Sequence, residues 1–346
     1  FFVIVLMDDD CLRVTSHNLG SVFILSFRRL WTVSNTFGAS HCYRSVIFNQ
    51  VLELPMNKIV SAEQAIAQIS DGMTVGIGGW GPRRKPMALI REILRSDLKD
   101  LTIVAYGGAD VGMLCAAGKV KKVIFAFVSL DFIPLEPYFR EARQNASIEV
   151  MEVDEGMLLL GLRAAAWKIP FIPTSVGLGT DVIKNNSDLA VISSPYDEKD
   201  WVAMPALKLD VALVHVDKAD SRGVCQIKGP DLYMDDWFAR AAAVTIASSE
   251  DIVESDYFSS SDEARYVHWE RSETTAVVHL PCGAHPTSCA PLYGFDVTHF
   301  KTYNASVKEG GFGPYCDTYI AGKDEQEYQQ AVGGLDKIKS IPLPIY

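Results

Sequence analysis

The chain has 346 residues, of which 48% are hydrophobic and 22% are charged, and its formal net charge is −11. This composition excludes a disordered chain, a collagen-like fibre and a small disulfide-stapled protein, and the length suits one large domain or two ordinary ones. With 32 basic against 43 acidic residues we expect no nucleic-acid partner, and with no apolar run of about 20 residues we expect no membrane span.

The seven cysteines and seven histidines are scattered along the chain, without a Cys-x-x-Cys or His-x-x-x-His pair. Because zinc-ribbon and helix-borne sites depend on such spacing, we expect no metal site. An odd number of scattered cysteines is typical of reduced thiols, which favours a cytoplasmic location. His215, inside the apolar run 211–216, is interpreted as a core histidine, and His285, in a Gly-Ala-His-Pro turn, as a structural one.

Residues 1–55 show no clear periodicity and carry three consecutive aspartates, Asp8 to Asp10, directly after a short apolar run. A secretory signal would instead place positive charge before its apolar core. A regular pattern begins only after Met56. We therefore hypothesise that Met56 is the natural start, that 1–55 is translated upstream sequence or a fusion remnant, and that 56–346 is the folded domain.

Predicted strands and helices alternate from Met56 onward. A capping box, Ser61-Ala-Glu-Gln64, begins the first helix. The elements that follow are expected over 73–77 (strand), 86–97 (helix), 101–106 (strand), 110–117 (helix), 120–128 (strand), 136–145 (helix), 147–153 (strand) and 156–167 (helix). The less regular second half predicts strands over 206–216 and 275–280 and helices over 235–243 and 328–338. This alternation indicates an α/β fold, with a mostly parallel open sheet and flanking helices.

Open parallel sheets bind ligands at the carboxyl ends of their strands, and three segments that could do so follow predicted strands. These segments are Gly78–Lys85, Gly107–Asp110 and Asp154-Glu155. The first belongs to the pattern Gly76-x-Gly-Gly-x-Gly81 and ends in three cations, Arg83, Arg84 and Lys85. It lacks the helical glycine and the acidic strand end that a dinucleotide site needs, so nicotinamide binding is disfavoured. Bare amides and cations before a helix suit a phosphate, and the alternative is a tight turn followed by a solvated basic patch.

Asp154 and Glu155 begin a predicted helix, where acidic residues are often only structural because they cap the helix and complement its dipole. Their place after a strand, at the ligand-binding edge of the sheet, favours a second interpretation. A carboxylate that faces a shielded cleft there could act as a general base or a nucleophile. No Gly-x-Ser-x-Gly motif is present, which disfavours a standard serine hydrolase.

The order of these motifs resembles the class I coenzyme A transferase family, specifically its α subunit. The resemblance covers about residues 58–285 and rests on 75–90, 118–123, 152–156, 169–171, 177–180, 209–214 and 219–223. The runs Gly-Trp-Gly-x-Arg-Arg-Lys-Pro-Met, Tyr-Gly-Gly and Asp-Glu-Gly-Met are similar to one branch, the bacterial hydrolase that opens the last steroid ring as a CoA thioester. The chain departs from the family at Gly223, which Val224 follows in place of Asn, and over 1–55, which matches nothing in the family.

The resemblance implies a glutaconate CoA-transferase-like fold, a β-subunit partner in a heterodimer often paired into a heterotetramer, and coenzyme A as part of the substrate, with no permanently bound cofactor. It implies that Glu155 is the catalytic carboxylate of a ring-cleaving hydrolase. The alternative is CoA transfer between carboxylic acids, in which the β subunit carries the glutamate. A ligand sensor is less favoured because 1–55 contains no basic recognition helix. The residues implied to bind the CoA thioester are Gly78, Gly79, Trp80, Gly81, Arg83, Arg84, Lys85, Gly107 and Gly108.

Overall fold

The computed structural model describes residues 4–8, 11–15, 57–133 and 135–343. The chain divides into two compact units, Phe1–Leu52 and Glu53–Tyr346. In the first unit, β1 (Ile4–Asp8) pairs antiparallel with β2 (Cys11–Thr15). The hypothesis about Met56, and most of the segment 1–55, lie outside the described residues.

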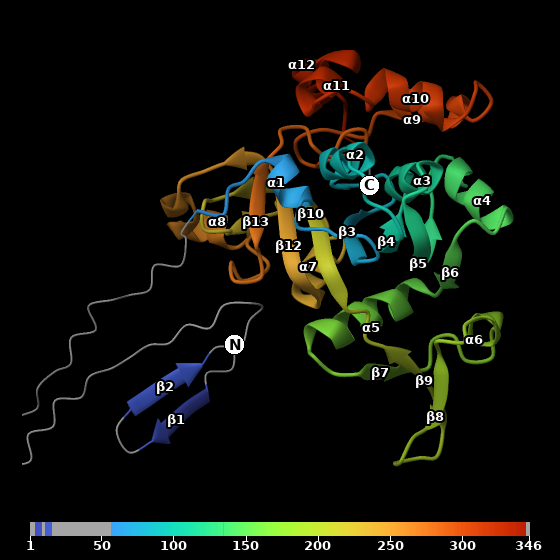
Figure 1. Cartoon of the computed structure of the whole chain (residues 1–346), viewed down its shortest axis with the longest axis vertical. Coiled ribbons are helices and arrows are strands. Elements are labelled where there is room, and N and C mark those ends of the chain that lie inside the picture. The colour runs from blue at the N-terminus through green and yellow to red at the C-terminus, as the bar shows by residue number, and fades with distance from the viewer. Residues whose placement is uncertain (1–3, 9–10, 16–56, 134, 344–346) are drawn as a thin grey trace, which may run out of the picture. The chain divides into compact units, whose positions relative to one another are not determined.

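An eight-stranded sheet forms the centre of the second unit (Figure 1). Its strands in spatial order are β13 (Ala276–His279), β12 (Ala242–Ile252), β10 (Leu209–Ala219), β3 (Thr74–Trp80), β4 (Leu101–Gly107), β5 (Val120–Val128) and β6 (Glu149–Glu152), with β11 (Cys225–Gln226) beside β10. All pairings along this path are parallel, and β11 is antiparallel to β10. The predicted open parallel sheet is confirmed, and the carboxyl ends of its parallel strands lie at one edge.

Helices cover both faces of this sheet because side chains of successive strand residues point to opposite faces. In β10, Val211 and Leu213 belong to one core, whereas Ala212 and Val214 belong to the other. The helices of the first core are α1 (Ala62–Ile66), α2 (Met87–Arg95), α3 (Ala109–Ala116), α4 (Pro137–Gln144), α9 (Val297–Ser306) and α10 (Phe312–Tyr319). Those of the second core are α5 (Glu155–Ala166) and α7 (Asp235–Ala241). Burial on both faces explains the continuous apolar run that predicts β10.

A small antiparallel sheet projects beyond α5 (Figure 1) and is missing from the sequence prediction. Its strands are β7 (Phe171–Thr174), β9 (Asp200–Pro205) and β8 (Ala190–Ser193), and α6 (Asp181–Asn185) lies between β7 and β8 along the chain. Both faces of β7 and β8 are largely open, so their residues show no clean alternation of apolar and polar side chains. Tyr196, in the turn between β8 and β9, is 96% exposed.

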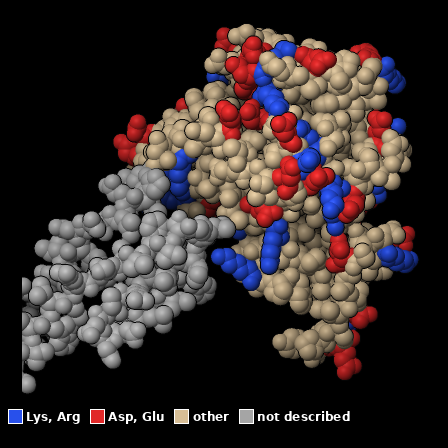
Figure 2. All heavy atoms as spheres, viewed as in Figure 1, with Lys and Arg blue, Asp and Glu red and all other residues tan. Residues whose placement is uncertain are grey.

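The C-terminal helices lie on the side of the sheet that carries α2 and α3 (Figure 1). The single helix predicted over 328–338 is wrong, because α11 (Glu325–Ala331) and α12 (Leu335–Lys339) are separate. Gly333 and Gly334, with φ of +110° and +91°, leave the helical conformation between them. A short 3₁₀ helix (Ser255–Ser259) and α8 (Ser261–Ala264) follow β12. On the face shown in Figure 2, basic and acidic side chains are interspersed, and no helix of the described residues is long and apolar enough to cross a membrane.

The carboxyl group of Glu136 is buried where α4 meets α9, and it makes a pH-dependent contribution to stability. It accepts hydrogen bonds from the Tyr303 hydroxyl and the Phe139 amide, each at 2.6 Å. Burial raises the pKa of Glu136 from 4.5 to about 7, against the opposing effect of these bonds. The stabilising contribution is therefore full below about pH 4.5 and is lost as the pH rises through about 7, by about 1.4 kcal/mol per pH unit.

We expect Glu136→Gln to remove this fall in stability. Urea unfolding of both proteins between about pH 5 and 7 should show that the difference in their free energies of unfolding changes with pH, in favour of the variant at the higher pH. The difference between the two proteins isolates this group from buried histidines such as His299, whose lowered pKa acts in the opposite direction. A difference that is constant across the range would contradict the prediction.

Candidate active site

A pocket of about 440 Å³ lies at the carboxyl edge of the sheet. It is lined by Trp80, Arg83, Glu155, Pro230, Asp231, Tyr233 and Met234. These residues come from the end of β3, the start of α5 and the loop that precedes α7. The structure therefore brings together three of the residues predicted from sequence and adds four from a loop that the prediction left out.

Glu155 is the first residue of α5, and its side chain is exposed to the pocket. The neighbouring Asp154 caps the helix, since its Oδ1 accepts from the Gly156 amide at 2.8 Å. The Glu155 main-chain carbonyl accepts from the Tyr106 hydroxyl at 2.8 Å, which fixes the start of the helix to β4. Within the described chain no hydrogen bond or ion pair engages the Glu155 carboxylate itself. The capping role thus belongs to Asp154, and the carboxylate of Glu155 is free for chemistry.

Trp80 and Arg83 form one wall of the pocket. The Arg83 guanidinium lies over the Trp80 ring, 4.9 Å from its centroid, and its Nη1 is 2.5 Å from Oδ2 of Asp131. The side chains of Arg83 and Asp131 keep 18% and 28% exposure, so this ion pair borders solvent. Of the three predicted phosphate-binding cations, Arg83 is the one that reaches the pocket.

Arg84 and Lys85 point into the protein rather than toward a ligand. The Arg84 side chain is 2% exposed and its Nη2 lies 3.2 Å from Oδ2 of Asp235. Lys85 is fully buried with its Nζ 3.1 Å from Oδ2 of Asp110, and burial lowers its pKa against the pull of that aspartate. The alternative of a solvated basic patch is wrong for these two residues, because both are buried, and each buried charge has a partner inside the fold. We reassign them from phosphate contact to support of the loop.

The glycine residues shape the loop more than they offer free amides. Gly79, with φ of +76°, donates its amide to Oδ1 of Asp235 at 2.6 Å, and Gly81, with φ of +53°, donates to the Tyr106 carbonyl at 3.1 Å. A Cβ on Gly108 would lie 2.7 Å from the Gly81 carbonyl oxygen, so this glycine permits the close approach of the two loops. Gly78 and Gly107 are likewise buried, and a Cβ on either would meet a neighbouring side chain at 2.5 and 2.8 Å respectively. None of these five glycines lines the pocket.

The loop 230–234 was missed because its placement depends on a distant residue. Arg84 donates from Nη1 to the Asp231 carbonyl and from Nη2 to the Leu232 carbonyl, each at 2.8 Å. Tyr233 and Met234 then adopt positive φ angles of 50° and 64°, which non-glycine residues seldom do, so the loop is held in a strained conformation at the pocket. The preceding Gly-Pro-Asp run is the sequence signal that could have identified a turn here.

An open parallel sheet with a tight glycine loop and a free glutamate at its carboxyl edge defines the class of protein. The chain belongs to the coenzyme A transferase family, whose pattern matches residues 59–264. The family predicted from the motifs is thereby confirmed.

Two members of the family and one crystal structure are similar to this chain over most of its length. The chain is 44% identical over 284 residues to the cholesterol ring-cleaving hydrolase IpdA subunit of Mycobacterium tuberculosis, a match that covers 80% of this chain and 97% of the relative. One subunit of the glutaconate CoA-transferase of Acidaminococcus fermentans is 28% identical, with 83% and 96% covered. The crystal structure of that glutaconate CoA-transferase matches the fold with a TM-score of 0.76, over 82% of this chain and 96% of the other, at 27% identity.

Proposed function

We propose that this chain is the α subunit of an enzyme that hydrolyses a ring carbon–carbon bond in a steroid-derived CoA thioester. The observation that carries the proposal is the free carboxylate of Glu155, which lines a pocket at the ligand-binding edge of a coenzyme A transferase fold. The similarity to the ring-cleaving IpdA subunit over nearly its whole length supports this substrate class. CoA transfer between carboxylic acids is the second candidate, supported by the glutaconate CoA-transferase relative at lower identity.

The proposed reaction begins when Glu155 removes a proton from a water molecule that adds to a ring ketone. The resulting tetrahedral oxyanion collapses to a carboxylic acid as the bond to the adjacent carbon breaks, and that carbon leaves as an enolate that takes up the proton held by Glu155. Donors are needed where the oxyanion develops. Because the amides of Gly79 and Gly81 are already engaged, we assign this role to the Arg83 guanidinium rather than to the glycine loop.

We propose that the pocket is completed by a partner subunit. The ring-cleaving hydrolase relative and the glutaconate CoA-transferase relative are both named as subunits. Glu155 is exposed in the single chain, whereas catalysis by a general base is most effective in a site that excludes bulk water. A β subunit that covers the pocket would bury Glu155 and would exclude bulk water.

Isotope labelling separates hydrolysis from transfer. The full chain, co-purified with its β subunit, is given a CoA thioester with a cyclic ketone in H₂¹⁸O, and the product is analysed by mass spectrometry. We expect one ¹⁸O in the newly formed carboxylate, and no turnover by the chain alone. Transfer would instead move CoA to an added carboxylic acid and leave a glutamyl–CoA thioester on the partner, which borohydride reduces and hydroxylamine cleaves. Detection of that adduct, without ring opening, would replace the hydrolase assignment by the transferase.

A further inference from the structure

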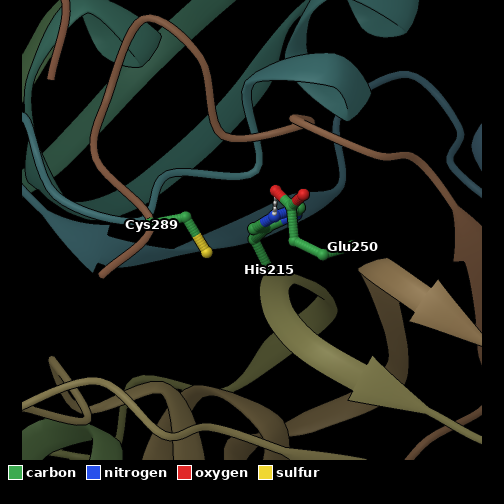
Figure 3. Close-up of side chains that lie close together, drawn as sticks. All are labelled: His215, Glu250 and Cys289. Carbon is green, nitrogen blue, oxygen red and sulfur yellow. Dashed lines mark hydrogen bonds and ion pairs between the residues drawn. The ribbon is translucent and has the colours of Figure 1, made fainter. Parts of the chain in front are cut away.

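A second cavity, of about 650 Å³, lies at the carboxyl ends of β10, β12 and β13. Asp217 and Glu250 line it, and the fully buried His215 and Cys289 lie next to them. Figure 3 shows three of these side chains, His215, Glu250 and Cys289. Each offers one atom that could ligate a metal ion, and these three atoms lie within 4.8 Å of one another. Asp217 lies beside the group, and its Oδ1 accepts a hydrogen bond from the Cys289 Sγ at 3.4 Å. An imidazole, a thiol and two carboxylates therefore meet beside one cavity.

Three of these four side chains are held in place through their other polar atom. The hydrogen bonds join His215 Nδ1 to Ser248 Oγ at 2.8 Å, the Cys282 amide to Glu250 Oε2 at 2.7 Å, and the Lys228 amide to Asp217 Oδ2. Of the atoms left over, His215 Nε2 lies 2.8 Å from Glu250 Oε1, and Asp217 Oδ1 faces the Cys289 sulfur. Protein side chains that ligate metals are oriented by such bonds to the atom that does not touch the ion.

His215 and Glu250 face each other inside the group. His215 Nε2 lies 2.8 Å from Glu250 Oε1, and that oxygen also accepts from the Tyr293 hydroxyl at 2.5 Å. An imidazole nitrogen and a carboxylate oxygen are both able to ligate a metal ion.

We propose that His215, Glu250 and Cys289 bind one zinc ion and leave its fourth position to a water molecule. Mixed imidazole, thiolate and carboxylate ligands are typical of zinc, which binds them at about 2.0–2.3 Å. Zinc binding would release the thiol proton of Cys289, because the thiolate is the form that ligates a metal.

A fifth residue points to a ligand in the same cavity. Gln226 is fully buried and lines the cavity, and its Oε1 has no hydrogen-bond partner within the described chain. An orphaned buried acceptor is costly unless something supplies a donor, and a zinc-bound water would do so. The three ligands are separated by up to 74 positions in the sequence and come from two strands and a loop, so no spacing motif in the sequence predicts the site.

The ion would act as a structural support for the active-site pocket. It would join the ends of β10 and β12 to the loop that contains Cys289. The adjacent Ser288 carbonyl accepts from the Arg84 amide at 2.6 Å, and Arg84 in turn holds the loop 230–234. Zinc removal should therefore loosen the pocket without removing any group that touches the substrate.

The test uses the full chain, purified without a histidine tag, stripped with EDTA and then loaded with Zn²⁺ or Co²⁺. We expect elemental analysis after gel filtration to find about one zinc per chain, and we expect zinc to raise the melting temperature. Cobalt should give the sulfur-to-cobalt charge-transfer absorption of a thiolate ligand. Cys289→Ser should abolish this absorption, and Glu250→Gln should weaken zinc retention by at least tenfold.

Cys225→Ser is the matched control, because Cys225 is an equally buried thiol that contacts Thr274 rather than this cluster. It should keep both the zinc and the cobalt absorption. If Cys289→Ser does not fold, the wild-type cobalt spectrum still decides, since only a bound thiolate produces that band. Wild-type protein that retains no zinc and shows no such band would overturn the proposal and leave His215 and Glu250 as a buried hydrogen-bonded pair. Loss of the band in Cys225→Ser would overturn it as well.

Discussion

We expect Glu155→Gln to lower kcat by about 10²–10⁴ while the fold remains intact, because the amide keeps the shape of the side chain but cannot accept a proton from water. The helix that carries the residue should be unaffected, since Asp154 and not Glu155 caps it. The loss should appear in kcat more than in KM, because a base acts in the transition state and contributes little to binding. Steady-state kinetics on the complex with the β subunit, with circular dichroism of each variant, would measure both effects.

Asp154→Asn is the matched control for this prediction. It removes an equal charge one residue away, and asparagine is as good a helix cap as aspartate. Turnover and stability of this variant should stay close to those of the wild type. If Glu155→Gln turned over at nearly the wild-type rate, the base would have to be sought on the partner subunit, and the transferase alternative would gain support.

The position of Glu155 was predictable because it depends on local order alone. A strand, a turn and a helix in a parallel sheet place the residue after the strand at the ligand-binding edge, whatever the rest of the chain does. Trp80 and Arg83 follow from the same reasoning at the end of β3. The parallel sheet was predictable for a similar reason, since strands buried on both faces produce continuous apolar runs.

The burial of Arg84 and Lys85 could not be predicted, because a run of basic residues has the same sequence pattern whether it is exposed or buried. Burial depends on a carboxylate partner, and the one that pairs with Arg84 lies 151 positions further along the chain. The prediction that His215 is a core histidine is confirmed, but its partners Ser248 and Glu250, on the neighbouring strand β12, could not be predicted from the residues around it in the sequence. The polar end of that strand does not resemble a buried strand in sequence. Ser248 and Glu250 are buried there because their side chains hydrogen-bond to His215 on β10.

Asp235→Ala should cost about 3–5 kcal/mol in the free energy of unfolding, the largest effect that we expect from a single substitution outside the pocket. The loss has two sources, since Arg84 keeps a buried positive charge without its partner and the Gly79 amide loses its acceptor. Urea unfolding of the full chain measures the change. The control is substitution of Lys184, which pairs with Asp181 at the surface, where the two side chains are 75% and 79% exposed. Loss of this pair should cost about 1 kcal/mol or less.

The ion pair itself contributes little to this stability, and a double substitution can show it. Burial raises the pKa of Asp235 to about 6 even though Arg84 acts to lower it, so desolvation outweighs the attraction between the two charges. Arg84→Met combined with Asp235→Leu should therefore recover the part of the stability that Asp235→Ala loses through the unpaired charge of Arg84, but not the part lost at the Gly79 amide. The double variant should nevertheless be impaired in turnover, because the carbonyls of Asp231 and Leu232 lose the donors that hold the pocket loop. Recovery of stability together with full activity would show that the loop 230–234 keeps its shape without Arg84.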